Sequence, residues 1–275
     1  MKYPSSAYEG DDLDRQPLLA APNETLEKHI RDATDELAGR FLRKRAYTLA
    51  RLLQSYNINI SLNDAKNALL YSVIFHDVGK AYDWFQIRIV KAVNKNSQNF
   101  SVPRHELFSA FATMQILTKN AFTNFFQLLR NCVLLSIVWS HSATRGMVLP
   151  KIMYTTPNFV KVKVIRLSER KKLEIVSILN SILLEYECKA GIDLLKLPKE
   201  ISVDEVGRML KMLHESLSDN PLLYYATLPI LSTIQIVDSL VAHKNRGGKP
   251  QVHIIDLPNL SVMGRVRETL WSIEQ

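Results

Sequence analysis

The residues of this sequence that are best suited to chemistry are histidines and aspartates in apolar surroundings. His76 and Asp77 stand side by side directly after the apolar-rich stretch YSVIF at 71–75. An imidazole nitrogen next to a carboxylate oxygen can bind a divalent metal ion. A buried carboxylate without a cation is costly, so Asp77 is expected to have a cationic partner. That partner is either a metal ion or, in the structural alternative, Lys80 in HDVGK.

Three further residues lie in comparable settings. His105 opens the helical pattern RHELFSAF, His141 ends the apolar run LLSIVWSH, and Asp238 lies within IQIVDSLVA. A lone histidine in such a place more often has a structural role than a metal-binding one. An acid among apolar residues needs a counter-charge, so Asp238 is the harder to explain structurally. His29 is considered below. No role is assigned to the other three histidines, which are His214, His243 and His253.

Other kinds of chemistry find little support. The sequence contains no phosphate-binding G-x-x-x-x-G-K-[ST] loop, no G-x-G-x-x-G, no G-x-S-x-G and no H-E-x-x-H. Cys132 and Cys188 are too far apart in the sequence to form a C-x-x-C pair. We interpret both as buried thiols, which argues against thiolate metal sites and thiol redox chemistry.

The composition is that of a folded protein with a basic surface. The 275 residues are 47% hydrophobic, and 35 Lys and Arg against 27 Asp and Glu give a net charge of +8, which favours a polyanionic partner. Cations cluster at 40–51, at 161–172 and in an expected loop at 242–250. Such clusters favour a polymeric phosphate substrate, although each could instead be a solvated face.

Helical periodicity dominates the chain and places these residues. The pattern predicts helices over 23–42, 45–56, 61–79, 104–120, 125–141, 170–187, 202–217 and 222–244. In the first of them Asn23 is the expected cap, and Leu26, Ile30 and Ala33 share a face on the helix that carries His29. Alternating residues at 160–167 and 251–257 predict two strands that pair as a small β-ribbon.

The expected organisation is an acidic N-terminal arm at 1–22 and a single domain at 23–275, since no Gly-rich or Pro-rich linker divides the chain. No secretory signal is visible at the N-terminus. The uncharged stretch at 221–237 contains two prolines and falls short of a membrane span, so it is expected to be a buried helix. These features predict a cytoplasmic protein.

The string HDVGKA, together with LEKHIRD, RHELFSA, WSHSATRG and IQIVDSLVA, resembles the HD-domain phosphohydrolases. The order of the motifs is most similar to that of the CRISPR-associated HD nucleases of type I interference, here as a stand-alone subunit without its helicase. The resemblance runs from about residue 23 to about residue 245 and implies a mainly α helical bundle. It also implies a set of metal ligands: His29, His76, Asp77, His105, His141 and Asp238.

The same resemblance assigns further roles. Asp77 would bridge two ions and act catalytically, while Lys80 would neutralise charge on the phosphoryl oxygens. Arg104 and Arg145, from their positions beside ligand histidines, could bind phosphates of the substrate. Many relatives have two adjacent histidines where this chain has Ser140 and His141. The cofactor is therefore one or two divalent ions, with Mn, Co, Ni or Mg as candidates.

The expected function is metal-dependent hydrolysis of phosphodiester bonds in DNA, preferably single-stranded, during CRISPR type I interference against foreign DNA in the prokaryotic cytoplasm. The resemblance implies a separate superfamily 2 helicase and an RNA-guided surveillance complex as partners. Two alternatives remain open: an HD-type nucleotide or cyclic-nucleotide phosphohydrolase, and a non-catalytic nucleic-acid-binding subunit.

Overall fold

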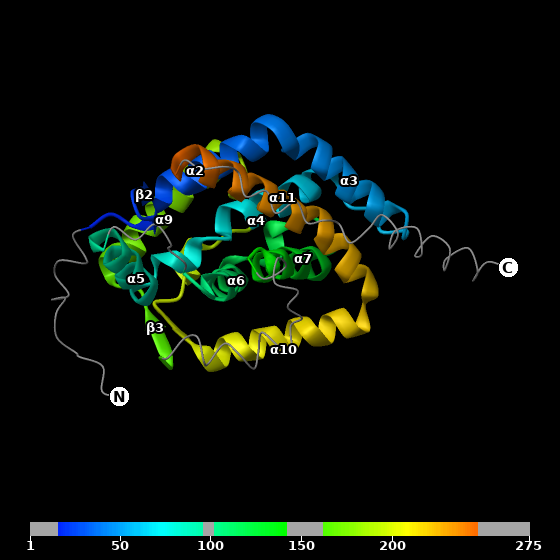
Figure 1. The fold of residues 1–275 in the computed structure, drawn as a ribbon. Coiled ribbons are helices and arrows are strands. Elements are labelled where there is room, and N and C mark those ends of the chain that lie inside the picture. Colours follow the sequence, from blue (N-terminus) through cyan, green and yellow to red (C-terminus); the bar gives the residue numbers. More distant parts are fainter. Residues whose placement is uncertain (1–15, 96–101, 142–161, 247–275) are drawn as a thin grey trace.

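The computed structural model describes residues 16–95, 102–141 and 162–246, and it is mainly helical, as predicted. Figure 1 shows how the helices are arranged. Their bounds are α2 (Leu26–Glu36), α3 (Leu42–Gln54), α4 (Leu62–Phe75), α5 (Asp83–Asn94), α6 (His105–Ile116), α7 (Phe126–Trp139), α9 (Glu169–Glu185), α10 (Val203–Asp219) and α11 (Pro221–Arg246). A π-helical turn at Leu37–Phe41 joins α2 to α3, and a 3-10 turn at Val78–Ala81 follows α4.

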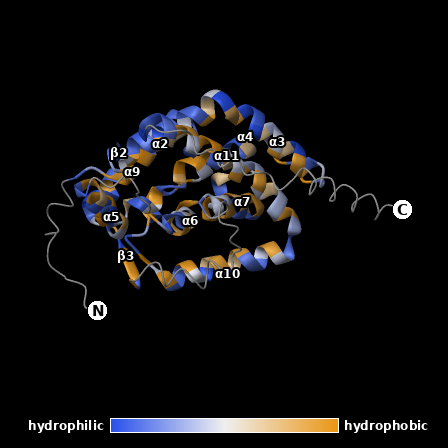
Figure 2. Ribbon diagram, in the orientation of Figure 1, coloured by the Kyte–Doolittle hydropathy of each residue, from blue (hydrophilic) through white to orange (hydrophobic). Residues whose placement is uncertain are grey.

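The centre of the bundle consists of α4, α6 and α7. Most residues of these helices are buried, so their sequences are largely apolar and have no pronounced polar face. Figure 2 shows orange, hydrophobic colouring on α6 and α7 and alternating colours on the outer helices α2 and α3. His105 thus begins one of these central helices, and His76 and His141 lie just beyond the ends of the other two.

Helix α11 packs against α7, α3, α4 and α2. Among the described residues it is the one helix long and apolar enough to cross a membrane by length and composition alone. Its buried side chains, which include Ile230, Ile234 and Val237, instead contribute to the core. The prediction of a helix over 221–237 with a buried face is therefore confirmed. The helix continues beyond this stretch to Arg246.

The strands form two small antiparallel pairs. Strand β1 (Leu19–Ala21) pairs with β2 (Glu24–Thr25), and β3 (Val164–Arg166) pairs with β4 (Glu200–Ser202). A small β-ribbon beside the helices was predicted, and β3 lies within its first predicted strand, where it pairs with the unpredicted strand β4. Ile165 lies opposite Ile201, and both are buried, which gives β3 a place against the core. The other predicted strand, at 251–257, lies outside the described residues.

The start of the fold differs from the prediction in two respects. Leu18, Ala20 and Ala21 are buried in the core, so the C-terminal end of the predicted arm belongs to the packed structure, and residues 1–15 lie outside the described part. The cap of α2 is Thr25, whose Oγ1 accepts a hydrogen bond from the Lys28 amide. Asn23 instead has a positive φ of 66° and forms the turn between β1 and β2.

Helix α5 was not predicted, because a polar residue lies on its buried face. Gln86 is buried, and its amide group donates hydrogen bonds to the carbonyl oxygens of Leu19 and Lys80. Two of the predicted basic clusters also differ from the solvent-exposed segments that the sequence indicates. Lys171 is buried and paired with Asp83, and the expected loop at 242–250 is helical up to Arg246.

Candidate metal centre

Five helices bring all six predicted ligands to one place. His29 is on α2, His76 and Asp77 follow α4, His105 begins α6, His141 follows α7, and Asp238 is on α11. The candidate ligand atoms form two sets, and the atoms within each set all lie within 4.8 Å of one another. We call His29, His76, Asp77 and Asp238 the first ligand group, and Asp77, His105 and His141 the second ligand group.

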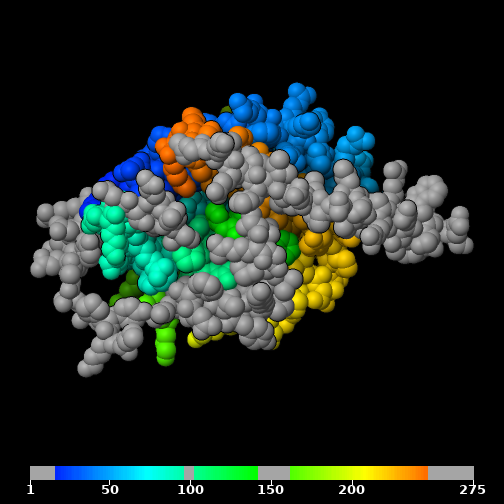
Figure 3. Space-filling model, in the orientation of Figure 1, coloured from blue at the N-terminus to red at the C-terminus, as the bar shows by residue number. Residues whose placement is uncertain are grey.

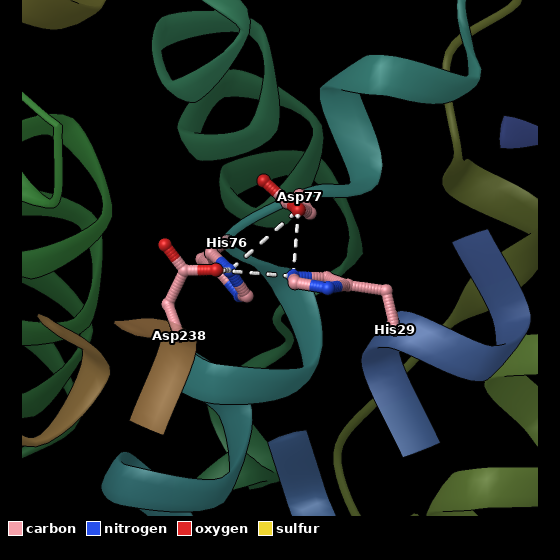
Figure 4. Close-up of side chains that lie close together, drawn as sticks. All are labelled: His29, His76, Asp77 and Asp238. Carbon is pink, nitrogen blue, oxygen red and sulfur yellow. Dashed lines mark ion pairs between the residues drawn. The ribbon is translucent and has the colours of Figure 1, made fainter. Parts of the chain in front are cut away.

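Asp77 belongs to both groups and uses a different oxygen for each. Its Oδ2 lies 3.1 Å from Nε2 of His29 and 3.7 Å from Nε2 of His76. Its Oδ1 lies 2.8 Å from Nε2 of His105 and 3.9 Å from Nε2 of His141. Asp238 completes the first group, with Oδ1 at 3.1 Å from Nε2 of His29 (Figure 4). Asp77 thus contributes one carboxylate oxygen to each ligand group.

The histidine rings are held through their other nitrogen. Nδ1 of His76 lies 2.7 Å from the Val73 carbonyl oxygen, and Nδ1 of His105 lies 2.6 Å from the Val102 carbonyl oxygen. A carbonyl oxygen only accepts hydrogen bonds, so Nδ1 carries the proton in both rings. This arrangement is typical of metal-binding histidines, because it fixes the ring and leaves Nε2 free to bind an ion.

The same atoms show that the site suits a metal ion. Nε2 of His29 and Nε2 of His76 are buried, and neither makes a hydrogen bond of normal geometry with a described residue. A lone pair on such a nitrogen would face carboxylate oxygens, which is unfavourable unless a proton or a cation lies between them. Ligands at right angles around an ion with bonds of about 2.1 Å lie about 3 Å apart, as the atoms around His29 do.

The electrostatics of the site keep its carboxylates charged. Burial acts to raise the pKa of Asp77, but the charge of Lys80, together with the surrounding imidazoles, holds it well below its usual range. Burial acts in the same direction on Asp238, and the neighbouring rings of His29 and His76 hold its pKa well below the usual range. Burial and the charge of Lys80 lower the pKa of His105, so this imidazole is neutral and able to bind an ion.

One residue of the site was missed by the sequence reasoning. Glu24 is buried, and its Oε1 accepts a hydrogen bond of 2.9 Å from Nδ1 of His29. Its two oxygens also accept hydrogen bonds from Asn245 and Arg246 at the end of α11. Burial acts to raise the pKa of Glu24, but the hydrogen bond and charge of His29 and the charge of Arg246 lower it to about 2. Glu24 therefore orients His29 as the carbonyl oxygens orient the other two rings.

The turn after Asp77 is fixed against the start of α6. The amide of Gly79 donates a hydrogen bond of 2.7 Å to Oγ of Ser109. A Cβ atom on Gly79 would lie 2.2 Å from the carbonyl oxygen of His105 and 2.8 Å from the amide nitrogen of Ser109. Only glycine fits there, and this close approach brings the turn that carries Asp77 to the helix that carries His105.

The other predicted site residues have different outcomes. Nζ of Lys80 donates a hydrogen bond of 2.6 Å to Oδ2 of Asp77, so the structural alternative of an ion pair is present. Arg104 is 2% exposed and has a left-handed φ of 72° just before α6, and its phosphate-binding role stays a prediction. Ser140 donates a hydrogen bond to the Ile137 carbonyl oxygen of its own helix. Arg145 lies outside the described residues.

The cysteines behave as predicted. Cys132 and Cys188 are buried and not bonded to each other. Burial raises the pKa of both thiols to about 12, so they stay protonated and unreactive at neutral pH.

No model of a known protein family matches the chain, and no curated protein matches it in sequence. Among solved structures, the chain is similar to the CRISPR-associated Cas3 HD domain protein MJ0384 from Methanocaldococcus jannaschii. The two share 16% sequence identity and a TM-score of 0.47, over 81% of this chain and 99% of that chain. The function proposed below rests on the site residues and not on this similarity.

Proposed function

We propose that this protein is a divalent-metal-dependent phosphodiesterase that cleaves DNA, preferably single-stranded DNA, in CRISPR type I interference against foreign DNA. The observation that carries the proposal is the shared carboxylate of Asp77, which has one oxygen in each of two histidine-containing ligand groups. Sites with two adjacent ions are common among enzymes that hydrolyse phosphate esters.

In this proposal the first ligand group holds one ion and the second ligand group holds the other. Ions bound there would provide a nucleophile at neutral pH and stabilise negative charge on the phosphate. The protein itself contributes the orientation of the rings, since His29, His76 and His105 are each held at Nδ1. The absence of thiolate ligands favours Mn, Co, Ni or Mg as the ion.

Lys80 has a second role in the proposal. Its ammonium group is almost fully buried and paired with Asp77. Because a divalent ion on Asp77 would compensate the carboxylate charge, the ammonium group would then be available to the phosphoryl oxygens of the substrate. The proposed partners are a separate superfamily 2 helicase, which would deliver a displaced strand, and an RNA-guided surveillance complex in the cytoplasm.

The first experiment measures cleavage of labelled single-stranded DNA, duplex DNA and cyclic nucleotides by metal-stripped protein after addition of Mn, Co, Ni, Mg or Zn. The Asp77→Ala variant is measured alongside, with His214→Ala as the matched control on the exposed side of α10. We expect metal-dependent cleavage of single-stranded DNA that Asp77→Ala abolishes and His214→Ala retains. Cleavage of cyclic nucleotides alone would instead identify a small-nucleotide phosphohydrolase.

A further inference from the structure

Helix α3 has an unusual distribution of charge. The 27 residues from 37 to 63 contain five cations and no acid. Arg43, Lys44 and Arg51 are exposed, and none of them makes an ion pair with a residue that the structure describes. Solvated helix faces more often mix the two signs of charge; on α10, for example, Lys211 lies near Glu215. This part of the surface is therefore suited to a polyanion.

The cations share one side of the helix with an aromatic ring. Lys44, Tyr47 and Arg51 are spaced by three and four residues and so lie on one face, while Ala46, Leu49 and Leu53 face the core. Tyr47 is 47% exposed. We call Arg43, Lys44, Tyr47 and Arg51 the α3 surface. Figure 3 shows α3, in blue, on the outside of the molecule.

A hollow lies at the C-terminal half of this surface. It has a volume of about 480 Å³ and is lined by Tyr47, Arg51 and Gln54 of α3 and by Asn59 and Ile60 of the following loop. This volume lies in the range of small-molecule sites in proteins. The tyrosine ring offers a stacking surface, and the two amide side chains offer both donors and acceptors. These are the groups that bind a planar heterocycle with polar edges.

We propose that the α3 surface binds single-stranded DNA, with one unpaired base in the hollow against Tyr47 and the neighbouring phosphates on Arg43, Lys44 and Arg51. Arg43 and Arg51 are eight residues apart, which is about 12 Å along the helix and spans several phosphates of one strand. A duplex would not fill the hollow, because its bases are stacked inside. The identity of the polymer rests on the proposed function.

Helix α3 is a neighbour of one helix that carries a candidate ligand. Helix α3 packs against α11, and Arg45 donates a long hydrogen bond of 3.5 Å to Ser232 of that helix. Ser232 precedes the ligand Asp238 by six residues, which is about 9 Å along α11. The N-terminal part of α3 therefore lies beside the helix that carries Asp238 of the first ligand group.

The test measures binding of fluorescent oligonucleotides to metal-free protein, so that catalysis is not required. The probes are a thymidine oligonucleotide, an abasic oligonucleotide of equal length and a duplex. We expect the protein to prefer the thymidine strand over both others. Tyr47→Ala should weaken binding of the thymidine strand by about fivefold or more and leave the abasic strand unaffected, while Tyr47→Phe should retain wild-type binding.

The double variant Arg43→Gln, Lys44→Gln should weaken binding of both strands and reduce the slope of log affinity against log salt by about 1.4. Arg208→Gln, Lys211→Gln on α10 removes the same charge from exposed positions and should have a much smaller effect. Equal losses in the two double variants, or a Tyr47→Ala variant that binds thymidine strands normally, would overturn the proposal.

Hydrolysis of bis(p-nitrophenyl) phosphate separates this inference from the proposed function. The compound is too small to need the α3 surface, so the α3 variants should hydrolyse it at the wild-type rate. Failure of the wild-type protein to hydrolyse it with any metal would count against the metal centre and leave the binding results to be judged independently.

Discussion

The two ligand groups of the metal centre differ in how completely the protein surrounds them. The first has four ligands, and both of its imidazoles are held through Nδ1, by Glu24 and by a backbone carbonyl oxygen. The second has three ligands, one of which, His141, lies beyond the last turn of α7 with a side chain that is 33% exposed. Under the proposed function, the first group, with four ligands, would retain an ion more firmly than the second group, with three.

This comparison suggests a division of labour. A site with more ligands in fixed positions binds an ion more tightly, because less side-chain entropy is lost on binding. An ion that keeps open coordination positions can bind substrate oxygens. We therefore expect the first group to retain its ion through purification and the second to be filled from solution.

The largest effect is expected for His29→Gln, which removes a buried ligand of the first group. The variant should lose the retained ion and cleave DNA at least about a thousandfold more slowly than wild type. Metal content per chain after gel filtration, measured by mass spectrometry, and the cleavage rate check both points. Wild-type metal content in this variant would show that the first group does not hold the ion.

A smaller effect is expected for His141→Gln in the second group. Cleavage should fall on the order of 100-fold, because one of three ligands is lost. The retained ion should remain, and added metal should recover part of the rate. His214→Gln, an exposed change of the same type on α10, is the control. If His141→Gln and His29→Gln lose the same amount of bound metal, the two groups do not differ as described.

Glu24→Gln tests whether the hydrogen bond to His29 makes the first group tight. Loss of the carboxylate charge should weaken metal affinity about 10- to 100-fold, the usual range for partners of ligand histidines. The cleavage rate at saturating metal should change much less. Isothermal titration with Mn or Co measures the affinity, and Glu24→Asp should recover part of it if the negative charge is the cause.

The smallest effect is expected for Thr25→Ala, next to Glu24 in the sequence. Thr25 caps α2 through a hydrogen bond to the Lys28 amide, and loss of such a cap costs about 1 kcal/mol in the free energy of unfolding. Urea denaturation measures this change. Metal affinity should stay within about twofold of wild type. A large loss of affinity here would indicate that the Glu24 variant acts by loosening α2.

Much of the helical structure could be predicted, because helical periodicity is a local signal. The set of six candidate ligands came from the resemblance to the HD-domain phosphohydrolases, since a lone histidine such as His105 or His141 more often has a structural role. Leu26, Ile30 and Ala33 are buried together as their spacing indicated. Asp77 and Asp238 were expected to need cations because acids are costly among apolar residues, and both lie in the cluster.

What could not be predicted depends on contacts between distant residues. Strand β3 pairs with a segment that begins 34 residues after its own end, and no local pattern identifies that partner. No sequence pattern distinguishes Glu24 from other acidic residues. It belongs to the site because it accepts hydrogen bonds from His29, five residues later, and from Arg246. Gln86 interrupts the helical pattern of apolar residues in α5. Its polar amide lies on the buried face, where it donates hydrogen bonds to backbone carbonyl oxygens.

The tight approach at Gly79 also bears on how this protein can evolve. Because the turn after Asp77 contacts the first turn of α6 directly, the positions of Asp77 and His105 are set by that contact and not by the length of chain between them. The number of residues between this turn and α6 could then change without loss of the proposed metal centre. Substitution of this one glycine would not be tolerated, and related sequences should vary in that spacing while retaining the glycine.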